Sequence, residues 1–310
     1  KMLNIHKQLS DDVIFAGGSW IWNGIAPNYS KTFACTKAAL QTCKKYQMKE
    51  VLCTAWMDNG AETPVDAVWP GVALFAHLGF HLEYDEKVLE EEFKECVGGN
   101  LKDFMALDAF DSLFLNGKAN QEAQNPSKYL LYQDPLAGIF DQEVVMSGVD
   151  TGVYYEKLKE QMVACQENSP EYAALFAYYE KLAAVLSDKA DLGVRMKAAY
   201  DKNQLLALKE ICEKEIPETI QNLEEMKILR EDLWMSEAKP FGYELMDVKL
   251  GAVITRLNST RRRVKKYLEG SIPCLEKLEE ARLPYFEKNA DKRENRWSQI
   301  ISGSDLIDTI

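Results

Sequence analysis

The sequence lacks any apolar run of the roughly 18–20 residues that would cross a bilayer, so we expect no membrane segment. Residues 1–8 contain no apolar core followed by a small-residue cleavage site, so we do not expect them to be a signal peptide. They are expected instead to be the end of a helix, as though the chain began within a domain.

A cysteine framework is missing as well. The seven cysteines are odd in number and scattered, and none forms a C-x-x-C pair. The three histidines, His6, His77 and His81, do not lie near the cysteines in a ligand pattern. We therefore expect no zinc site, no other cofactor and no disulfides. Free thiols of this kind are typical of the reducing cytoplasm, which is the location we expect.

Basic residues are in short supply, since 37 of them face 49 acidic residues and the net charge is −12. A negative field repels phosphate backbones, so we do not expect nucleic acid as a partner. One basic cluster, within residues 261–266, lies in a strongly helical segment. Such a cluster is more typical of a solvated helix face than of a binding patch.

What the sequence does contain differs between its two parts. Val13–Ala16 and Glu50–Trp56 are strand candidates. Ser30–Tyr46, with its first residue as the N-cap, and Val65–Phe80 have apolar residues at helical spacing. This βαβα order predicts a parallel sheet covered by helices. Two such units cannot close a barrel, so residues 1–82 are predicted to be the end of a larger α/β domain.

Residues 83–310 are predicted to form a mostly α-helical domain. Apolar residues recur at steps of three and four over 172–186 and again over 246–268. A further helical pattern over Leu205–Trp234 contains Pro217, where we expect a kink or break.

A cluster of charged residues in this helical part suits packing rather than catalysis. Some of its members are expected to form ion pairs where helices pack against each other or against the barrel. The cluster consists of Lys239, Glu244, Asp247, Lys249 and Arg256.

Two tryptophan-bearing segments follow the strand candidates. The first, AGGSWIWNG, contains Trp20 and Trp22. The second, TAWMDNGAE, contains Trp56, Asp58 and Glu62. Ligands of α/β folds bind beyond the carboxyl ends of parallel strands, and an indole face beside a carboxylate suits a sugar. The alternative is that the tryptophans are core residues and the aspartate caps a turn.

These segments resemble the seventh and eighth strand ends of the barrel in a bacterial branch of glycoside hydrolase family 20, the exo-β-N-acetylhexosaminidases. The similarity continues through further motifs in the same order and spans nearly the whole chain. These motifs are SKYLLYQDPL at 127–136, DK at 188–189 with LG at 192–193, and KPFGYE at 239–244. The resemblance implies the C-terminal end of a (β/α)8 TIM barrel in residues 1–82, followed by an α-helical C-terminal domain in residues 83–310.

The same resemblance assigns roles to the strand-end residues. It implies that Trp56 forms a wall of the pocket for the terminal N-acetylhexosamine and that Asp58 binds the outer hydroxyls of the sugar. Trp20 and Trp22 are expected to line this pocket or its rim, and Glu62 lies in the same loop as the aspartate. One departure is a methionine between the Trp56 and Asp58 positions, where the family often has glycine.

The activity implied is retaining, substrate-assisted hydrolysis of terminal N-acetylglucosamine or N-acetylgalactosamine, without a cofactor. In the family an Asp orients the acetamido group and the adjacent Glu is the acid and base, and this pair follows the fourth strand. The only lookalike here, Asp85-Glu86, opens an acidic helix, whose N-terminus favours acidic side chains. We therefore expect no catalytic residue in this chain, and we expect the isolated chain to be inactive.

The alternative function is a non-catalytic carbohydrate-binding or assembly module. With either function, the expected small partner is a carbohydrate with a terminal N-acetylhexosamine. A second partner is expected to cover the apolar strands, which would otherwise be exposed. It is either the N-terminal remainder of the barrel or another copy of the chain.

Overall fold

The computed structural model describes residues 2–10, 12–22, 24–57, 61–81, 83–114 and 125–285. The first part of the chain forms α1 (Met2–Leu9), β1 (Phe15–Ser19), α2 (Tyr29–Lys45), β2 (Val51–Ala55), η2 (Val65–Val68), α3 (Trp69–Phe80), α4 (Glu86–Val97), α5 (Leu101–Met105) and η3 (Ala106–Asp111). The second part forms α6 (Pro126–Tyr132), α7 (Asp141–Ser147), α8 (Thr151–Asn168), η4 (Pro170–Tyr172), α9 (Ala173–Lys189), α10 (Leu192–Asp201), α11 (Leu205–Glu210), η5 (Ile211–Glu215), α12 (Ile216–Glu237), α13 (Glu244–Leu268) and α14 (Glu276–Glu279). The described chain is therefore mostly helical, as the sequence predicts.

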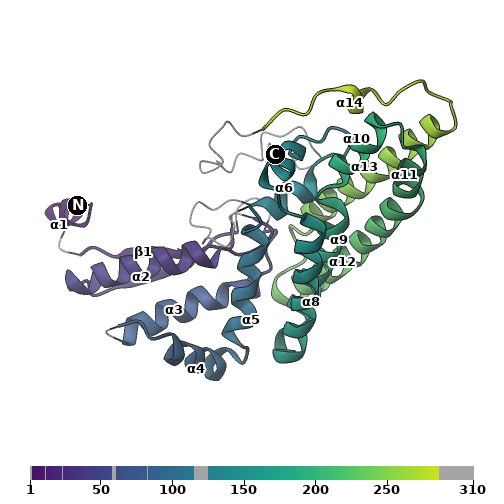
Figure 1. Ribbon diagram of the computed structural model, residues 1–310. Helices are drawn as coiled ribbons and strands as arrows, with labels where there is room; N and C mark the ends of the chain where they lie inside the picture. Colours follow the sequence, from purple (N-terminus) through teal and green to yellow (C-terminus); the bar gives the residue numbers. More distant parts are fainter. Residues whose placement is uncertain are drawn as a thin grey trace.

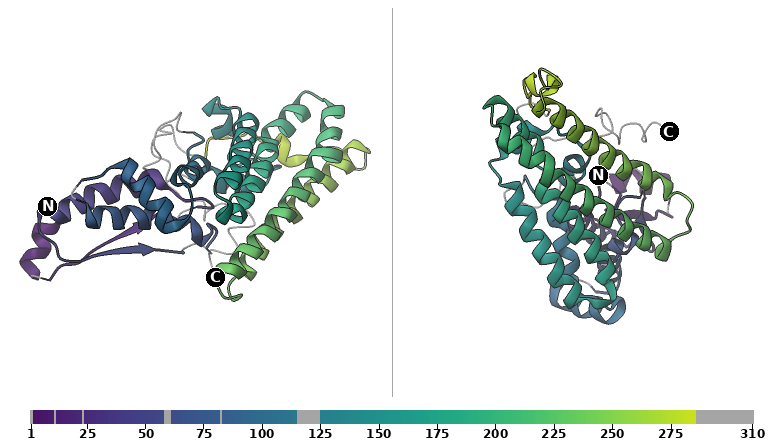
Figure 2. Two further views of the ribbon diagram at one scale, coloured as in Figure 1. Left: turned by 90° about the horizontal axis from the view of Figure 1, so that it is seen from below. Right: turned by 90° about the vertical axis from the view of Figure 1, so that its right-hand side faces the viewer.

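The two strands β1 and β2 pair in parallel, with Phe15 opposite Val51 and Ser19 opposite Ala55. Helix α2 connects them and packs on β1, and α3 packs on α2 and β1. Both helices lie on one face of the strand pair, and no described element covers the other face (Figure 2, left). The carboxyl ends of both strands point toward the helical part of the molecule (Figure 2, left).

Strand β1 begins two residues later than the sequence predicts. It also ends later, because it continues through Gly17 and Gly18 instead of stopping before them. These positions need glycine because aromatic rings lie against the backbone. A Cβ atom on Gly17 would lie 2.8 Å from the Phe15 ring, and one on Gly18 would lie 2.7 Å from the Trp22 ring. The prediction of Ser30 as the N-cap of α2 is also wrong, since the Asn28 side chain accepts from Lys31 N and caps the helix.

The helical part is built around four long helices, α8, α9, α12 and α13, which lie side by side (Figure 1). The predicted apolar faces are confirmed. In α9 they are buried from Leu175 to Leu186, and in α13 from Met246 to Val264. The predicted interruption near Pro217 is confirmed as the π-helical turn η5, which directly precedes α12. Proline lacks an N–H group, so the hydrogen-bond register can change there at low cost.

The two parts share one continuous hydrophobic core rather than meeting at a wet surface. Phe104 of α5 packs edge-to-face against Phe93 of α4 and against Tyr172 and Phe176 of the helical part. The predicted domain boundary between residues 82 and 83 lies in the connection of α3 to α4, and it stays a prediction. No helix within the described residues has the length and apolar character needed to cross a membrane.

Candidate functional site

The loop after β1 is anchored by the first turn of α2. The backbone N–H of Trp20 donates to Thr32 Oγ1 at 2.9 Å. The rings of Trp20 and Trp22 lie with their centroids 4.5 Å apart. The ammonium group of Lys31 lies 4.0 Å from the centroid of the Trp20 ring, which is cation–π distance. The two predicted tryptophans are therefore brought together as a half-buried pair beside a cation.

The third predicted tryptophan follows β2. Trp56 keeps 55% of its surface exposed, and its indole N–H donates to Thr54 Oγ1 at 3.0 Å. Because Ser19 pairs with Ala55, Trp20 and Trp56 leave the strand pair at the same level. The exposed indole of Trp56 is therefore available to a ligand at the carboxyl end of the strands. Asp58, the acid predicted to bind the sugar, lies outside the described residues.

Glu62 occupies a different environment from the tryptophans. It is buried, with 2% of its surface exposed, and three side chains of the helical part converge on its carboxylate. Lys249 Nζ of α13 lies 3.3 Å from Oε1, Tyr132 of α6 donates to Oε1 at 2.6 Å, and Lys128 of α6 forms an ion pair with Oε2. Both lysines are fully buried. We call Glu62, Lys128, Lys249 and Tyr132 the loop anchor.

A second set of contacts fixes the same loop through its backbone. Arg230 of α12, which is fully buried, donates to Ala61 O at 2.9 Å. Thr63 Oγ1 donates to Gly24 O at 2.9 Å and so ties the loop after β2 to the loop after β1. Glu237 accepts from Val65 N at 3.0 Å. Side chains of the helical part therefore hold the residues that follow β2 in place.

Two acids lie behind the loop after β1, the half-buried Asp108 and the buried Asp111. Burial raises the pKa of Asp108, whose Oδ1 accepts from Ser30 N at 3.0 Å. Burial also raises the pKa of Asp111 well above its ordinary value, and the neighbouring Asp108 raises it further. Both acids lie in η3, where they alternate with the buried Leu107 and Phe110. Strongly shifted pKa values of acids occur both at functional sites and in buried charge networks.

Sequence reasoning missed these two acids and most of the buried cations. The sequence does carry a signal for the cations, because each of these lysines recurs at helical spacing with the apolar residues of its helix. Lys249 lies in step with Met246 and Val253, and Lys189 lies in step with Leu182 and Leu186. A charge in phase with a core-facing stripe indicates a buried partner rather than solvent.

The predicted lookalike of the catalytic pair is a helix cap, as expected. Asp85 is the N-cap of α4, and its Oδ1 accepts from Lys87 N at 2.9 Å and from Val88 N at 3.3 Å. These bonds satisfy backbone donors at the helix start, so the position of Asp85 needs no catalytic explanation.

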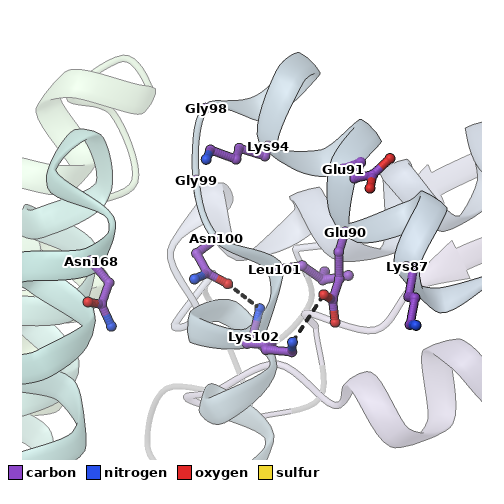
Figure 3. A pocket seen from close by; sticks show the side chains of 10 residues that line it. All are labelled: Lys87, Glu90, Glu91, Lys94, Gly98, Gly99, Asn100, Leu101, Lys102 and Asn168. Atoms are coloured by element: carbon purple, nitrogen blue, oxygen red, sulfur yellow. Dashed lines mark hydrogen bonds and ion pairs between the residues drawn. The ribbon is translucent and has the colours of Figure 1, made fainter.

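A surface cavity of about 550 Å³ lies between α4, the turn before α5 and the end of α8 (Figure 3). Lys102 pairs with Glu90 across it, and Asn100 caps its own helix, with Asn168 on the opposite side. Its described lining contains no aromatic side chain on which a sugar ring could pack. The strand ends are therefore the better candidate for a carbohydrate.

One group of three side chains in the described residues offers ligand atoms for a metal ion. It comprises His77, His81 and Glu92, whose ligand atoms all lie within 4.8 Å of one another. The group lies on the hairpin formed by α3 and α4. Gly71, near the start of α3, abuts Ser19, so His81 lies about 15 Å further along, away from the strand ends.

Residues 102–297 match the family described as the Glycoside Hydrolase 20C C-terminal domain. The chain belongs to this family. The resemblance to glycoside hydrolase family 20 is thereby confirmed, and the match begins in α5 and includes the described helices from α6 to α14. The comparison with curated proteins gave no match. A glycoside hydrolase 20C C-terminal domain places the chain among hexosaminidase-family proteins.

Proposed function

We propose that this chain is the C-terminal part of a retaining exo-β-N-acetylhexosaminidase that hydrolyses terminal N-acetylglucosamine or N-acetylgalactosamine by substrate-assisted catalysis. Residues 1–82 are the last two βα units of a TIM barrel, and residues 83–310 are its helical C-terminal domain. The chain supplies residues of the sugar pocket, whereas the catalytic Asp-Glu pair comes from outside it. No cofactor takes part.

The observation that carries the proposal is the pair of parallel strands whose carboxyl ends lead into tryptophan-bearing loops. Ligands of (β/α)8 enzymes bind at this end of the strands. The exposed indole of Trp56 offers a flat apolar wall, and the Trp20–Trp22 pair offers a second one. Asp58 completes the proposed pocket by accepting hydrogen bonds from the outer hydroxyls of the sugar.

Glu62 serves this pocket from behind in our proposal. Its carboxylate is already engaged by the two buried lysines and Tyr132 of the loop anchor. It therefore holds the loop between β2 and α3 in place, and through that loop it positions Trp56 and Asp58 for the sugar.

The uncovered face of the strand pair supports the proposed partner. Leu52 of β2 is 54% exposed and Ile14, which precedes β1, is 57% exposed. Apolar side chains on an open sheet usually mark an interface, and unpaired strand edges are a liability that proteins cover. We propose that the N-terminal remainder of the barrel covers this face, and that a second copy of the chain is the alternative. The free thiols of all seven cysteines support a cytoplasmic location.

The alternative function, a non-catalytic carbohydrate-binding or assembly module, keeps the same pocket but needs no barrel remainder. Intact-mass measurement of the native protein distinguishes the two functions. An enzyme requires a polypeptide that supplies the missing barrel strands, whereas a module would be complete in the 310 residues.

Kinetics in the complete enzyme test the pocket. Hydrogen bonds to a charged group contribute about 1.5–3 kcal/mol, so Asp58→Ala should lower kcat/KM by about 10–150-fold. Trp56→Ala should lower it at least as much, because a large packing surface is lost. Phe80→Ala and Asp232→Ala are matched controls, since Phe80 is 90% exposed at the far end of α3 and Asp232 is exposed on α12. If Asp58→Ala and Trp56→Ala behave like these controls, the proposed pocket is wrong.

A further inference from the structure

The hairpin of α3 and α4 brings two histidines of one helix end against a glutamate of the next helix. His77 Nδ1 lies 2.7 Å from Glu92 Oε2, and His81 Nε2 lies 2.6 Å from Glu92 Oε1. The two imidazole rings lie with their centroids 4.6 Å apart. Three side chains that each carry a metal-ligating atom therefore converge on one point at the surface.

The three side chains of the cluster differ in their exposure to solvent. The His77 side chain is fully buried, whereas the side chains of His81 and Glu92 are 43% and 37% exposed. His81 is the residue that follows α3, and Lys44 of α2 donates to its backbone carbonyl. The buried histidine thus forms the floor of the cluster, and the exposed pair leaves its outer side open to water.

The hydrogen bonds identify the protons that now hold the cluster together. Asp85 N–H donates to His77 Nε2 at 3.2 Å, so that nitrogen is an acceptor and the ring carries its proton on Nδ1. His77 Nδ1–H and His81 Nε2–H then both donate to the same carboxylate. One cation can take the place of these two protons, because each ring can move its proton to its other nitrogen.

We propose that His77, His81 and Glu92 form a binding site for one zinc-class divalent cation, with water in the remaining coordination positions. Two imidazole nitrogens and one carboxylate oxygen are a donor set that zinc accepts, and three protein ligands with an open position are typical of zinc sites that keep a water ligand. Hard cations such as Mg²⁺ prefer oxygen ligands and are not expected here. This site lies away from the strand ends, so it is independent of the proposed sugar pocket.

The site needs a small adjustment to hold the ion. With metal–ligand bonds of about 2.0–2.2 Å in tetrahedral geometry, neighbouring ligand atoms lie about 3.3 Å apart. The nitrogen–oxygen distances must therefore increase by about 0.6 Å, which the partly exposed Glu92 and His81 side chains can supply by rotation. Binding also moves the His77 proton to Nε2 and removes the acceptor of the Asp85 amide.

Zinc binding to the full chain, measured by isothermal titration after treatment with a chelator, tests the proposal. We expect one Zn²⁺ to bind per chain and Mg²⁺ to give no heat. His81→Ala removes a ligand and Glu92→Gln removes the charge but keeps a hydrogen-bond acceptor, and each should weaken binding by more than about tenfold. Both residues are partly exposed, so these variants should fold, which unfolding curves would verify.

His6→Ala and Cys96→Ser are the controls, because His6 lies on α1 and Cys96 is an exposed thiol one turn beyond Glu92. Both should bind zinc as the parent chain does. Hydrogen exchange adds a readout specific to the geometry, since the Asp85 amide should exchange faster when zinc is bound. The proposal is overturned if the chain binds no zinc, if binding is unchanged in either ligand variant, or if Cys96→Ser abolishes it.

Discussion

Removal of the Glu62 side chain is the sharpest perturbation that the loop anchor allows. Glu62 is the acid that pairs with Lys128 and Lys249, and both of those lysines are fully buried. Glu62→Ala leaves two buried ammonium groups without this carboxylate and removes the acceptor of the Tyr132 hydroxyl. The stability that this variant loses therefore includes the unfavourable free energy of burying charged groups, in addition to the loss of one contact.

The geometry gives the expected magnitude. At the 3.3 Å between Lys249 Nζ and Glu62 Oε1, Coulomb's law with an effective dielectric constant of about 20 gives about 5 kcal/mol of attraction. Most of this offsets the hydration that the charges lost on burial. Breaking a buried pair by removing one partner costs about 3–5 kcal/mol. Because a domain is stable by about 5–15 kcal/mol, Glu62→Ala should remove a large share of the free energy of unfolding.

Urea unfolding monitored by circular dichroism measures this loss. Glu225→Ala is the matched control, because Glu225 pairs with Lys181 at 2.8 Å with its side chain 42% exposed, and exposed pairs contribute less than about 1 kcal/mol. The double variant Glu62→Ala, Lys249→Met should recover part of the loss, since it also removes one of the two buried ammonium groups that Glu62 contacts. Equal losses in Glu62→Ala and Glu225→Ala would refute the reasoning, and so would the absence of any recovery in the double variant.

Two further predictions concern packing and protonation. In Gly71→Ala the new methyl group would lie 3.0 Å from Ser19 Cα and closer still to its side chain, so thermal unfolding should show a loss of about 1–3 kcal/mol. Gly79→Ala in the same helix meets nothing within 4 Å and should be neutral or stabilising, and equal effects of the two would contradict the close approach of α3 to β1. Burial lowers the pKa of Lys189 to about 7, so between this value and its ordinary one of 10.5 the unfolded chain holds a proton that the folded chain has released. The contribution of Lys189 to stability should therefore rise with pH from about 7 to 10 and be missing in Lys189→Met, and an equal pH dependence of denaturant unfolding in both proteins would contradict this.

Periodicity predicted the parts of the fold that depend on local pattern. The apolar stripes of α9 and α13 repeat for several turns, and the sequence alone locates both helices. The strand candidates were found as well, but the start and end of β1 were misplaced because Gly17 and Gly18 usually break strands. Here they are required by rings that pack on the backbone, which only the tertiary structure reveals.

The side-chain clusters were predicted less well, because they depend on partners far apart in the sequence. The expectation that some charges near Lys249 form ion pairs where elements pack is confirmed by its contact with Glu62. The sequence could not supply the partner itself. Similarly, the spacing of His77 and His81 gives no sign of Glu92, which reaches them because α4 folds back on α3. Residue spacing predicts which side chains share one face of a helix. Which side chains of two helices meet also depends on the angle between those helices, and spacing does not give that angle.

The loop anchor has a consequence for the order in which the protein is completed during synthesis. Glu62 and Lys249 are 187 residues apart in the chain. At the usual elongation rate of about 5–20 residues per second, Lys249 leaves the peptidyl transferase centre about 10–40 s after Glu62 does. Throughout this interval the carboxylate of Glu62 lacks the ammonium group of Lys249 and can meet only the anchor residues of α6 out of the loop anchor. The loop that leads from β2 to α3 therefore reaches its full set of anchor contacts only after α13 has been made.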